Sequence, residues 1–326
     1  MIDVSKSIHP KTGEPVLCRI ITIISIVIIL VPSNGSSNTV WESASSQDFN
    51  RIGYSTTECI INNTNSDGYI ELEKIGRWFE VTTQPQPPNR EGFGMSPISD
   101  NELLIYGGSA GQLDFLTDTW VFNYSANLWF EQKPSNHPPP RSGFGMSRMG
   151  NDDRIVIFGG SDGKNSIIYN DTWIYDMSEN NWYNVTTEFG PSGRYDTAIA
   201  PIFGTNQILL FGGMQSYPNY MQDTWIFNGD NYTWLEIIPK HKPEARCSHA
   251  MSMTYGQNKV VLFGGNHGEP KNDTWIYNSS DQDWKMGQHS TSPAFRDHPM
   301  MAPLDNDTIL LFGGIERANE YDYGDT

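Results

Sequence analysis

Short apolar runs without alternation recur along the chain, and each of them ends in a pair of glycines. A short apolar run that is bounded by turn residues and lacks helical spacing is typical of a strand buried on both faces. Each copy therefore predicts a buried β-strand. The copies read LLIYGG at 103–108, IVIFGG at 155–160, ILLFGG at 208–213, VVLFGG at 260–265 and ILLFGG at 309–314.

Two further strands are predicted after each of the first four glycine pairs, because aromatic residues that favour strands stand there between polar turn residues. The six residues NDTWIY occur at 170–175 and at 272–277, and near-copies occur at 117–122 and 222–227. A second tryptophan follows the tryptophan of each copy after nine residues. These second tryptophans are Trp129, Trp182, Trp234 and Trp284.

The spacing of these features defines a repeat of about 50 residues, since the first glycines of successive pairs are 52, 53, 52 and 49 residues apart. An arginine follows each second tryptophan after twelve residues, and another follows Trp78 at the same distance. The stretch after each arginine, such as RSGFGMSRM at 141–149, adds a fourth strand. The predicted fold class is all-β, in four-stranded sheets. The arginines are Arg90, Arg141, Arg194, Arg246 and Arg296.

A four-stranded sheet with two apolar faces is not stable alone in water, but it becomes stable when copies stack face to face around an axis. The glycine pairs allow a turn with positive φ and a close approach of neighbouring backbone. The tryptophans are predicted to fill the widening gap between sheets, where burial of one ring contributes on the order of 3 kcal/mol. The pattern predicts a β-propeller.

At these residues the chain resembles the kelch family, whose repeats combine an apolar strand ending in Gly-Gly with an aromatic residue and a tryptophan at set distances. The resemblance covers about residues 72–326 and implies a kelch-type β-propeller, similar to the central domain of galactose oxidase, with about five blades present. Kelch-like propellers include adaptors, enzymes and extracellular modules, so the resemblance predicts a fold more sharply than a function.

Both ends of the repeat region hold partial units. Asp325 and Thr326 have the spacing of the first two residues of a fifth DTW, and GRWFEVTT at 76–83 matches only the last strand of a blade. One interpretation is that the N-terminal strand completes the fifth blade and closes the ring. The interpretation that we favour is that the propeller is incomplete, because the sequence is a fragment of a longer chain with six or seven blades.

The start of the chain has the layout of a secretory signal peptide, predicted over residues 1–35. Lys6, Lys11 and Arg19 precede an apolar run at 20–31, and small or turn-forming residues follow. A helix of this length spans roughly 18 Å against a hydrocarbon core of about 30 Å. We expect a secreted or lumenal protein, and the alternative is a membrane anchor formed by residues 20–31. Residues 36–71 fit no repeat and are predicted to be an irregular lead-in.

Sites for N-glycosylation support the secretory interpretation, although the repeated Asn-Asp-Thr accounts for some of them. One sequon, at Asn34, falls within the predicted signal. Cys59 and Cys247 either pair in an oxidising compartment or remain thiols. The candidate glycosylation sites are Asn62, Asn123, Asn170, Asn184, Asn231, Asn272, Asn278 and Asn306.

The charge balance limits the classes of partner. The chain has 21 basic and 38 acidic residues, a net charge of −17. Non-specific binding to nucleic acid or to an anionic membrane surface needs positive patches, so neither is expected. Cationic partners, or solubility alone, fit this charge better.

No motif in the sequence predicts a cofactor or a metal. His-X-His, HExxH, G-x-S-x-G and nucleotide-binding loops are absent, and no cluster matches the copper ligands of the oxidases with kelch-like propellers. The five arginines lie on one circle by symmetry and are candidate ligands for a carboxylate, as in an enzyme that processes acidic sugars. The alternative is a structural role in the inter-blade loops, with Asp196 or Asp297 as local partners.

The loops after the glycine pairs vary, whereas the turn between the two tryptophans keeps its length. A fixed frame with variable loops is typical of a recognition surface, although loops also diverge when nothing constrains them. We predict a scaffold that binds a protein or a glycan; the alternative is a propeller enzyme that acts on a carbohydrate or another small molecule in the central channel. The candidate aromatic anchors are Phe115, Tyr169, Tyr217, Tyr220 and Tyr321.

Overall fold

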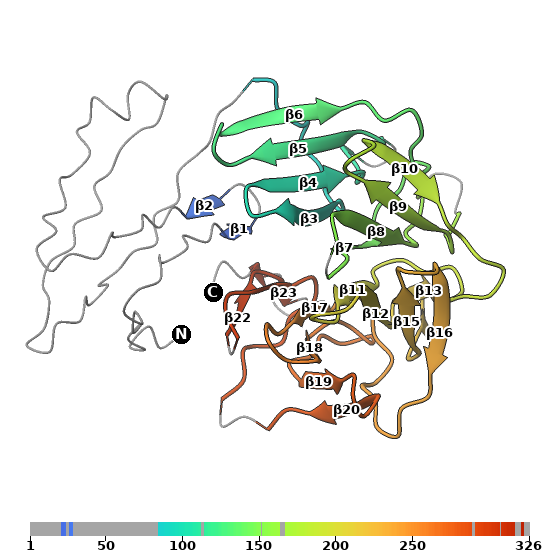
Figure 1. Cartoon of the computed structure of the whole chain (residues 1–326). Helices are drawn as coiled ribbons and strands as arrows, with labels where there is room; N and C mark the ends of the chain where they lie inside the picture. Colours follow the sequence, from blue (N-terminus) through green and yellow to red (C-terminus); the bar gives the residue numbers. More distant parts are fainter. Residues whose placement is uncertain are drawn as a thin grey trace, which may run out of the picture. The chain divides into compact units, whose positions relative to one another are not determined.

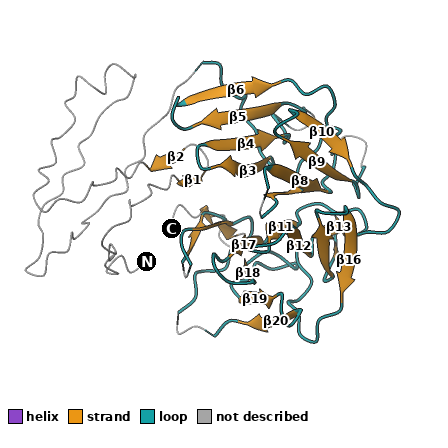
Figure 2. Ribbon diagram, in the orientation of Figure 1, coloured by secondary structure: helices purple, strands orange, loops and turns teal. Residues whose placement is uncertain are grey.

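The computed structural model describes residues 21–23, 26–28, 84–111, 114–150, 152–163, 167–288, 291–306, 308–316 and 321–322. The chain divides into two compact units, Met1–Gln84 and Pro85–Thr326. Every regular element of the described residues is a β-strand, as Figure 2 shows. The all-β fold class predicted from the apolar runs is confirmed.

In the first unit, two short strands lie within the apolar run at 20–31. β1 (Ile21–Ile23) pairs antiparallel with β2 (Ile26–Ile28). Among the described residues, no helix is long and apolar enough to span a membrane. The secretory signal and the anchor alternative both stay predictions. Cys59, Asn62, Trp78 and the lead-in at 36–71 lie outside the described residues.

The second unit contains four complete blades, each a sheet of four antiparallel strands in chain order. In the first blade these are β3 (Gly94–Ser99), β4 (Glu102–Tyr106), β5 (Thr119–Asn123) and β6 (Leu128–Gln132), and in the second β7 (Gly145–Arg148), β8 (Arg154–Phe158), β9 (Thr172–Asp176) and β10 (Asn181–Asn184). The third contains β11 (Ala198–Pro201), β12 (Gln207–Phe211), β15 (Thr224–Asn228) and β16 (Thr233–Ile237), and the fourth β17 (Ala250–Met253), β18 (Lys259–Phe263), β19 (Thr274–Asn278) and β20 (Asp283–Met286).

A fifth blade begins after the fourth. Its first two strands, β21 (Met300–Pro303) and β22 (Ile309–Phe312), pair antiparallel. Two small hairpins lie in the loops that follow a glycine pair: β13 (Met214–Ser216) with β14 (Asn219–Tyr220), and β23 (Ile315–Glu316) with β24 (Tyr321–Asp322). The expectation of about five blades, with the last incomplete, agrees with this arrangement within the described residues.

The first strands of successive blades lie side by side around a common centre, in the order β3, β7, β11, β17 and β21 (Figure 1). Chain direction alternates from strand to strand, so the loops after the glycine pairs and the connections between blades emerge at the same end of the sheets. We call this end the variable-loop face. The tight turns between the first and second strands, and between the third and fourth, lie at the opposite end.

The second tryptophan of each later blade packs between that blade and the preceding one, as predicted. The Trp182 ring centroid lies 4.8 Å from that of Tyr106 in the first blade and 5.1 Å from that of Tyr175 in its own blade. Trp234 and Trp284 are sandwiched in the same way, and all three are at most 5% exposed. The hydrophobic core is therefore a series of layers between adjacent blades.

The backbone conformation at the glycine pairs requires glycine. Both glycines of each pair have positive φ, between 62° and 100°, which favours glycine over any residue with a Cβ atom. A Cβ atom added at the second glycine would lie 2.6–2.9 Å from its nearest neighbour in every blade. The repeat keeps glycine here because the next segment of backbone or side chain occupies the space.

Candidate functional site

Each complete blade contains an ion pair between its buried arginine and the half-buried aspartate of its DTW motif. In the second blade, Arg141 Nη1 donates to Asp171 Oδ1 at 2.6 Å and Nη2 donates to Asp171 Oδ2 at 2.8 Å. Arg141 also donates to the carbonyl oxygens of Gly159 and Pro139. The same bidentate pairing joins Arg90 to Asp118, Arg194 to Asp223 and Arg246 to Asp273.

The first tryptophan of the motif donates to the same carboxylate. The distance from its Nε1 to the aspartate Oδ2 is 2.6 Å for Trp120 and 2.7 Å for Trp173, Trp225 and Trp275. Each aspartate thus accepts hydrogen bonds from a guanidinium and an indole. The arginine, the aspartate and the two tryptophans together are called the frame below.

Three of the frame aspartates, Asp118, Asp223 and Asp273, have lowered pKa values. Burial raises the pKa of Asp223, but the hydrogen bonds and charge of Arg194, with the Trp225 indole, outweigh burial and leave that pKa lowered. Asp118 and Asp273 have lowered pKa values through the same balance with Arg90 and Arg246. A half-buried carboxylate with these donors is a structural group, because both of its oxygens accept hydrogen bonds from neighbours within the blade.

The threonine of the motif connects adjacent blades. Trp182 Nε1 in the second blade donates to Thr119 Oγ1 in the first at 3.1 Å. Trp234 donates to Thr172 at 2.9 Å, and Trp284 donates to Thr224 at 3.1 Å. The residues of DTW therefore have two kinds of role. The aspartate and the first tryptophan form hydrogen bonds within a blade, and the threonine accepts a hydrogen bond from the next blade.

Of the arginines predicted as candidate carboxylate ligands, Arg90, Arg141, Arg194 and Arg246 form these ion pairs. The side chains of Arg90, Arg141, Arg194 and Arg246 are 0–3% exposed, and Arg296 is 2% exposed. A carboxylate ligand would have to displace the frame aspartates to reach the four that are paired. Arg296 donates to the carbonyl of Gly313, and its expected aspartate, Asp325, lies outside the described residues.

The structural alternative for the arginines named the wrong aspartate at Arg194. The sequence offers Asp196 or Asp297 as local partners of the inter-blade arginines. The carboxylate that receives the Arg194 guanidinium is that of Asp223, at 2.6 and 2.7 Å. Strand pairing brings Asp223 to the arginine over 29 residues, which spacing along the chain did not indicate.

Residues two positions after each arginine form a series of backbone hydrogen bonds from blade to blade. The N–H of Gly143 donates to the carbonyl of Gly92 at 3.0 Å, and Asp196 donates to Gly143 at 2.6 Å. Ser248 donates to Asp196 and His298 donates to Ser248, both at 2.8 Å. All five residues have φ between 50° and 64°. Three blades therefore place Asp, Ser or His in a conformation where the first two use glycine.

The Asp196 carboxylate lies over the preceding blade. A Cβ atom added at Gly143 would be 2.6 Å from Asp196 Oδ1, so the carboxylate fills the space that a side chain at Gly143 would need. Asp196, Ser248 and His298 were not among the predicted binding residues. The signal that identifies them is the departure from glycine at one position of the repeat.

The predicted aromatic anchors fall into different environments. Phe115 packs against Gly163 of the next loop. The guanidinium carbon of Arg141 lies 4.1 Å from the Tyr169 ring centroid, so the Tyr169 ring packs over this frame arginine. Tyr217 is 76% exposed, and Tyr220 is half-buried. Tyr321 lies in β24, and its side chain is not described.

Tyr217 and Tyr220 belong to the hairpin of β13 and β14, residues 214–220, which we call the tyrosine hairpin. Their ring centroids are 6.3 Å apart with planes at 80°. Tyr220 also packs edge-to-face on His267 at 4.9 Å, and its hydroxyl accepts a hydrogen bond from the Gly268 N–H at 3.1 Å. The hairpin is thus anchored to the loop of the fourth blade through Tyr220, while Tyr217 faces solvent.

Polar side chains continue from the tyrosine hairpin towards the fifth blade. Asn266 is 2% exposed, and its Oδ1 accepts from the Gly268 N–H at 2.8 Å. Its Nδ2 donates to Asp297 Oδ2 at 3.2 Å. Sequence reasoning missed Asn266, because it stands in a loop that differs from blade to blade, and named Asp297 only as a possible local partner of an arginine.

The candidate glycosylation sites differ in exposure. Asn170, Asn184, Asn231 and Asn306 are exposed, and Asn123, Asn272 and Asn278 are half-buried. Asn123 Nδ2 donates to Glu102 Oε1 at 3.1 Å. Glycosylation stays a prediction, with the exposed four as the accessible positions.

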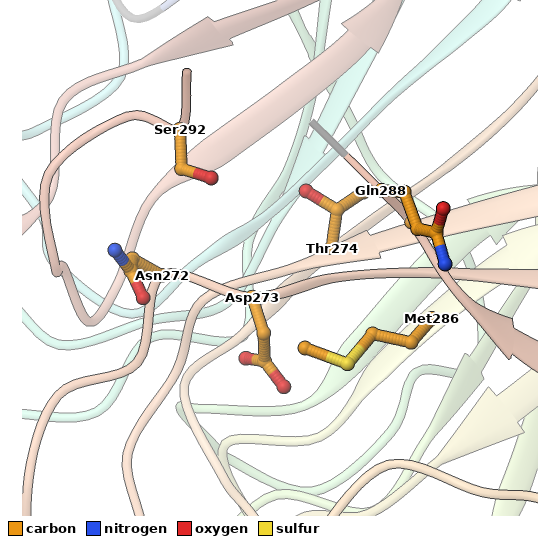
Figure 3. A pocket seen from close by; sticks show the side chains of 7 residues that line it. Asn272, Asp273, Thr274, Met286, Gln288 and Ser292 are labelled. Carbon is orange, nitrogen blue, oxygen red and sulfur yellow. The ribbon is translucent and has the colours of Figure 1, made fainter. Parts of the chain in front are cut away.

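A pocket of about 410 Å³ lies at the flank of the fourth blade (Figure 3). Its Thr274 corresponds to Thr119, Thr172 and Thr224, which each accept an indole N–H from the next blade. The pocket thus lies where the surface that contacts a following blade meets the variable-loop face, because Asn272 and Ser292 stand in loops of that face. Its other lining residues are Asn272, Asp273, Met286, Gly287, Gln288 and Ser292. Within the described residues, no group of three or more His, Cys, Asp or Glu could hold a metal ion.

Comparison with known proteins places these features in a family. The family model of the Attractin/LZTR1 beta-propeller matches residues 130–324, more than half of the chain. Similar curated proteins include the flagellar outer arm dynein alpha chain of Chlamydomonas reinhardtii, 27% identical over 73% of this chain and 6% of its own length. An F-box/kelch-repeat protein of Arabidopsis thaliana is 27% identical over 63% of this chain and 46% of its own length.

Two further similarities complete the comparison. Adagio protein 3 of Arabidopsis thaliana is 28% identical over 55% of this chain and 29% of its own length. The matched part of the chain thus spans less than half of each of these three relatives. The solved structure of YjhT superposes with a TM-score of 0.61 at 16% identity, covering 76% of this chain and 83% of that one. This last similarity concerns the fold alone.

Proposed function

Because the chain belongs to the Attractin/LZTR1 beta-propeller family, we propose that it is a binding scaffold whose variable-loop face recognises a protein or a glycan. Its kelch-type propeller supports a role in interaction, and one relative is named an F-box/kelch-repeat protein. The charged and indole groups of the frame are directed at one another, which leaves recognition to the loops that differ between blades.

The observation that carries this proposal is the exposure of Tyr217. A tyrosine that is 76% exposed on a hairpin fixed by Tyr220 presents a large amphipathic ring at little cost in conformational entropy. Tyrosine is enriched among residues that dominate binding energy at interfaces. The arginines that suggested a channel enzyme are buried, and four are paired with aspartates, so they add no support to that alternative.

The binding proposal is tested with the whole chain as bait against an extracellular protein and glycan fraction. Tyr217→Ala is compared with Tyr183→Ala, because Tyr183 is also exposed, at 39%, but lies on the outer strand β10. A partner retained by the wild type and Tyr183→Ala but lost by Tyr217→Ala supports the proposal. Equal retention by both variants argues against this face. A parallel screen for small molecules bound in the channel tests the enzyme alternative.

We also propose that the protein enters the secretory route and is glycosylated. The support is the charged residues before the apolar run at 20–31 and the exposure of Asn170, Asn184, Asn231 and Asn306. Expression of the whole chain in eukaryotic cells tests both points. Protein in the medium with a mass that falls after glycosidase treatment is expected; unglycosylated protein confined to the cytosol would refute the proposal.

A further inference from the structure

We infer that the tyrosine hairpin binds a neutral carbohydrate, with a sugar ring stacked on Tyr217. The inference rests on the proposed binding role of the variable-loop face and names the chemical class of the ligand. It is carried by three aromatic rings in contact, by a pair of amide side chains on the same hairpin and by the lack of acidic or basic residues at 214–222.

The aromatic part of the site runs from the hairpin to the loop of the fourth blade. The ring centroids of Tyr217 and Tyr220 are 6.3 Å apart, and those of Tyr220 and His267 are 4.9 Å apart. Tyr220 is fixed from a second direction, because its hydroxyl accepts the Gly268 N–H at 3.1 Å. Tyr217 packs on this fixed ring and is still 76% exposed. The hairpin therefore presents an aromatic ring whose position is set before a ligand arrives.

The charge distribution of a sugar ring matches such a surface. The face of an aromatic ring is negative. The C–H groups on one face of a pyranose have a partial positive charge, since each carbon is bonded to oxygen, and they lie flat against an aromatic face. The hydroxyl groups point outwards from the edge of the sugar and need hydrogen-bonding partners beside the ring.

Hydrogen-bonding groups for these hydroxyls are on the same hairpin. Asn219 Nδ2 donates to Gln215 Oε1 at 3.2 Å, and both side chains are exposed. This contact holds the two amides together and leaves the Gln215 Nε2 group and Asn219 Oδ1 without another hydrogen bond among the described residues. A hydroxyl both donates and accepts, so neighbouring hydroxyls of one sugar can bind this donor and this acceptor. Ser216, which pairs with Asn219 in the hairpin, adds an exposed hydroxyl.

The charges of the variable-loop face favour a neutral ligand. Residues 214–222 contain no acidic or basic residue. Exposed charges of both signs are distributed over the other described loops of the face, so the loops select neither a cationic nor an anionic segment. The acidic ones include Glu91, Asp114 and Glu269, and the basic ones include Lys133, Lys240 and Lys242.

The size of the patch also favours a small ligand over a protein. A standard protein interface buries about 800 Å² on each partner, and its core is apolar. The exposed residues beside Tyr217 include Gln215, Ser216 and Asn219, which are polar. A single sugar ring covers the tyrosine and reaches these groups, whereas the core of a protein interface would leave their hydrogen bonds unmade.

The test starts with the whole chain on a glycan array that displays neutral, sialylated and sulfated oligosaccharides. The neutral oligosaccharide that binds best is then titrated by calorimetry against the wild type, Tyr217→Ala, Tyr217→Phe and the double variant Gln215→Ala/Asn219→Ala. Tyr217→Phe keeps the ring face and removes only the hydroxyl. Tyr183→Ala is the matched control, because Tyr183 is also exposed, at 39%, but lies on the outer strand β10.

We expect Tyr217→Ala to weaken binding about threefold to tenfold through the loss of stacking. The double variant should weaken it by a similar factor, about threefold to tenfold, through the loss of the amide hydrogen bonds. Tyr217→Phe and Tyr183→Ala should each change it less than about twofold. Raising the NaCl concentration about tenfold should also have little effect, because salt screens only charged ligands.

Unchanged binding by Tyr217→Ala, or an equal loss in Tyr217→Phe and Tyr217→Ala, overturns the inference, because stacking would not be the cause. A preference for the sialylated or sulfated oligosaccharides, or binding that falls steeply with salt, overturns the neutral class of ligand. Circular dichroism and thermal unfolding of each variant show whether the fold is intact, so lost binding is not mistaken for unfolding.

The proposed function can survive the failure of this inference. An array without bound sugar, together with an extracellular protein that the wild type retains and Tyr217→Ala loses, overturns the carbohydrate site and leaves the binding role of the face standing. Retention of neither a sugar nor a protein counts against the inference and the proposed function together.

Discussion

The frame and the variable-loop face use the same kinds of residue in opposite ways. In the frame, Arg194 and Asp223 are directed at each other and at the Trp225 indole, all within one blade. On the variable-loop face, Asp196 has positive φ at a position where the first two blades have glycine, and Tyr217 is exposed on the tyrosine hairpin. A charged or aromatic residue that recurs at a fixed spacing is explained by the fold, and one that departs from the repeat is a candidate for binding.

The difference between the two regions is also one of stability. Removing a frame residue leaves a buried charge or donor without its partner, whereas removing a loop residue exposes little new surface. The following predictions test this difference, starting with the largest expected effect.

The Arg194–Asp223 pair should dominate the stability of the third blade. Arg194→Met keeps much of the side-chain volume but leaves the Asp223 carboxylate without its bidentate donor. We expect the free energy of unfolding to fall by about 3–5 kcal/mol, measured by urea denaturation. Adding Asp223→Leu to this variant should recover part of the loss. A loss below about 1 kcal/mol for the single variant would show that the frame pair is not a major contributor.

The buried His249 should make the protein sensitive to acid. Burial, helped by the charge of Arg246, lowers the pKa of His249 to about 3. The folded protein therefore keeps the ring neutral, while the unfolded chain binds a proton near pH 6.5. This stabilisation is present above pH 6.5 and is lost as the pH falls from 6.5 towards 3, by roughly 1.4 kcal/mol per pH unit.

The control for this prediction comes from the repeat itself. Phe93 and Phe144 occupy the position of His249 in the first two blades, three residues after the arginine. His249→Phe should flatten the dependence of unfolding free energy on pH between 6 and 4. Parallel curves for the variant and the wild type would contradict the assignment.

The inter-blade hydrogen bonds should have a smaller effect that depends on position. Thr172→Val leaves the buried Trp234 indole N–H without its acceptor, which we expect to cost about 1–3 kcal/mol. Thr274→Val makes the same change in the fourth blade, where no indole of the described residues donates to the threonine; its cost should stay below about 0.5 kcal/mol. Thermal unfolding of the two variants compares them directly, and equal losses would rule out the indole contact as the cause.

The exposed tip should have the smallest effect on stability. Tyr217→Ala removes a ring that is 76% exposed, so the free energy of unfolding should change by less than about 0.5 kcal/mol. The same variant is expected to lose partner binding. A large loss of stability would show that Tyr217 supports the fold as the frame residues do, and would remove the distinction between the two regions.

Much of the architecture could be predicted from the sequence, because each blade repeats the same strands, turns and buried side chains. The Gly-Gly strands predicted β4, β8, β12, β18 and β22 at their observed places. The tryptophan spacing predicted that Trp182, Trp234 and Trp284 are buried between blades, which is confirmed. Five concordant copies make such a pattern informative, since a side chain that recurs in every blade must satisfy the same neighbours each time.

The candidate site could be predicted only in part. Tyr217 and Tyr220 stand out in the sequence as aromatic residues in a variable loop, and the structure places them on one hairpin. Tyr169 has the same appearance in sequence, but it covers the Arg141 guanidinium. The sequence of one loop does not distinguish an aromatic residue that binds a partner from one that packs over a frame arginine. Both are aromatic, and both lie near the surface.

The sequence by itself determined the repeat, the type of blade and the residues that hold it together, since these depend on spacing and on burial that recurs. Only the tertiary structure decided which aspartate pairs with Arg194, and that Asp196 of the third blade lies against Gly143 of the second. The physical reason is that these contacts join residues from different strands or blades. Distances across a sheet and around an axis depend on how the elements stack, which no local pattern of residues specifies.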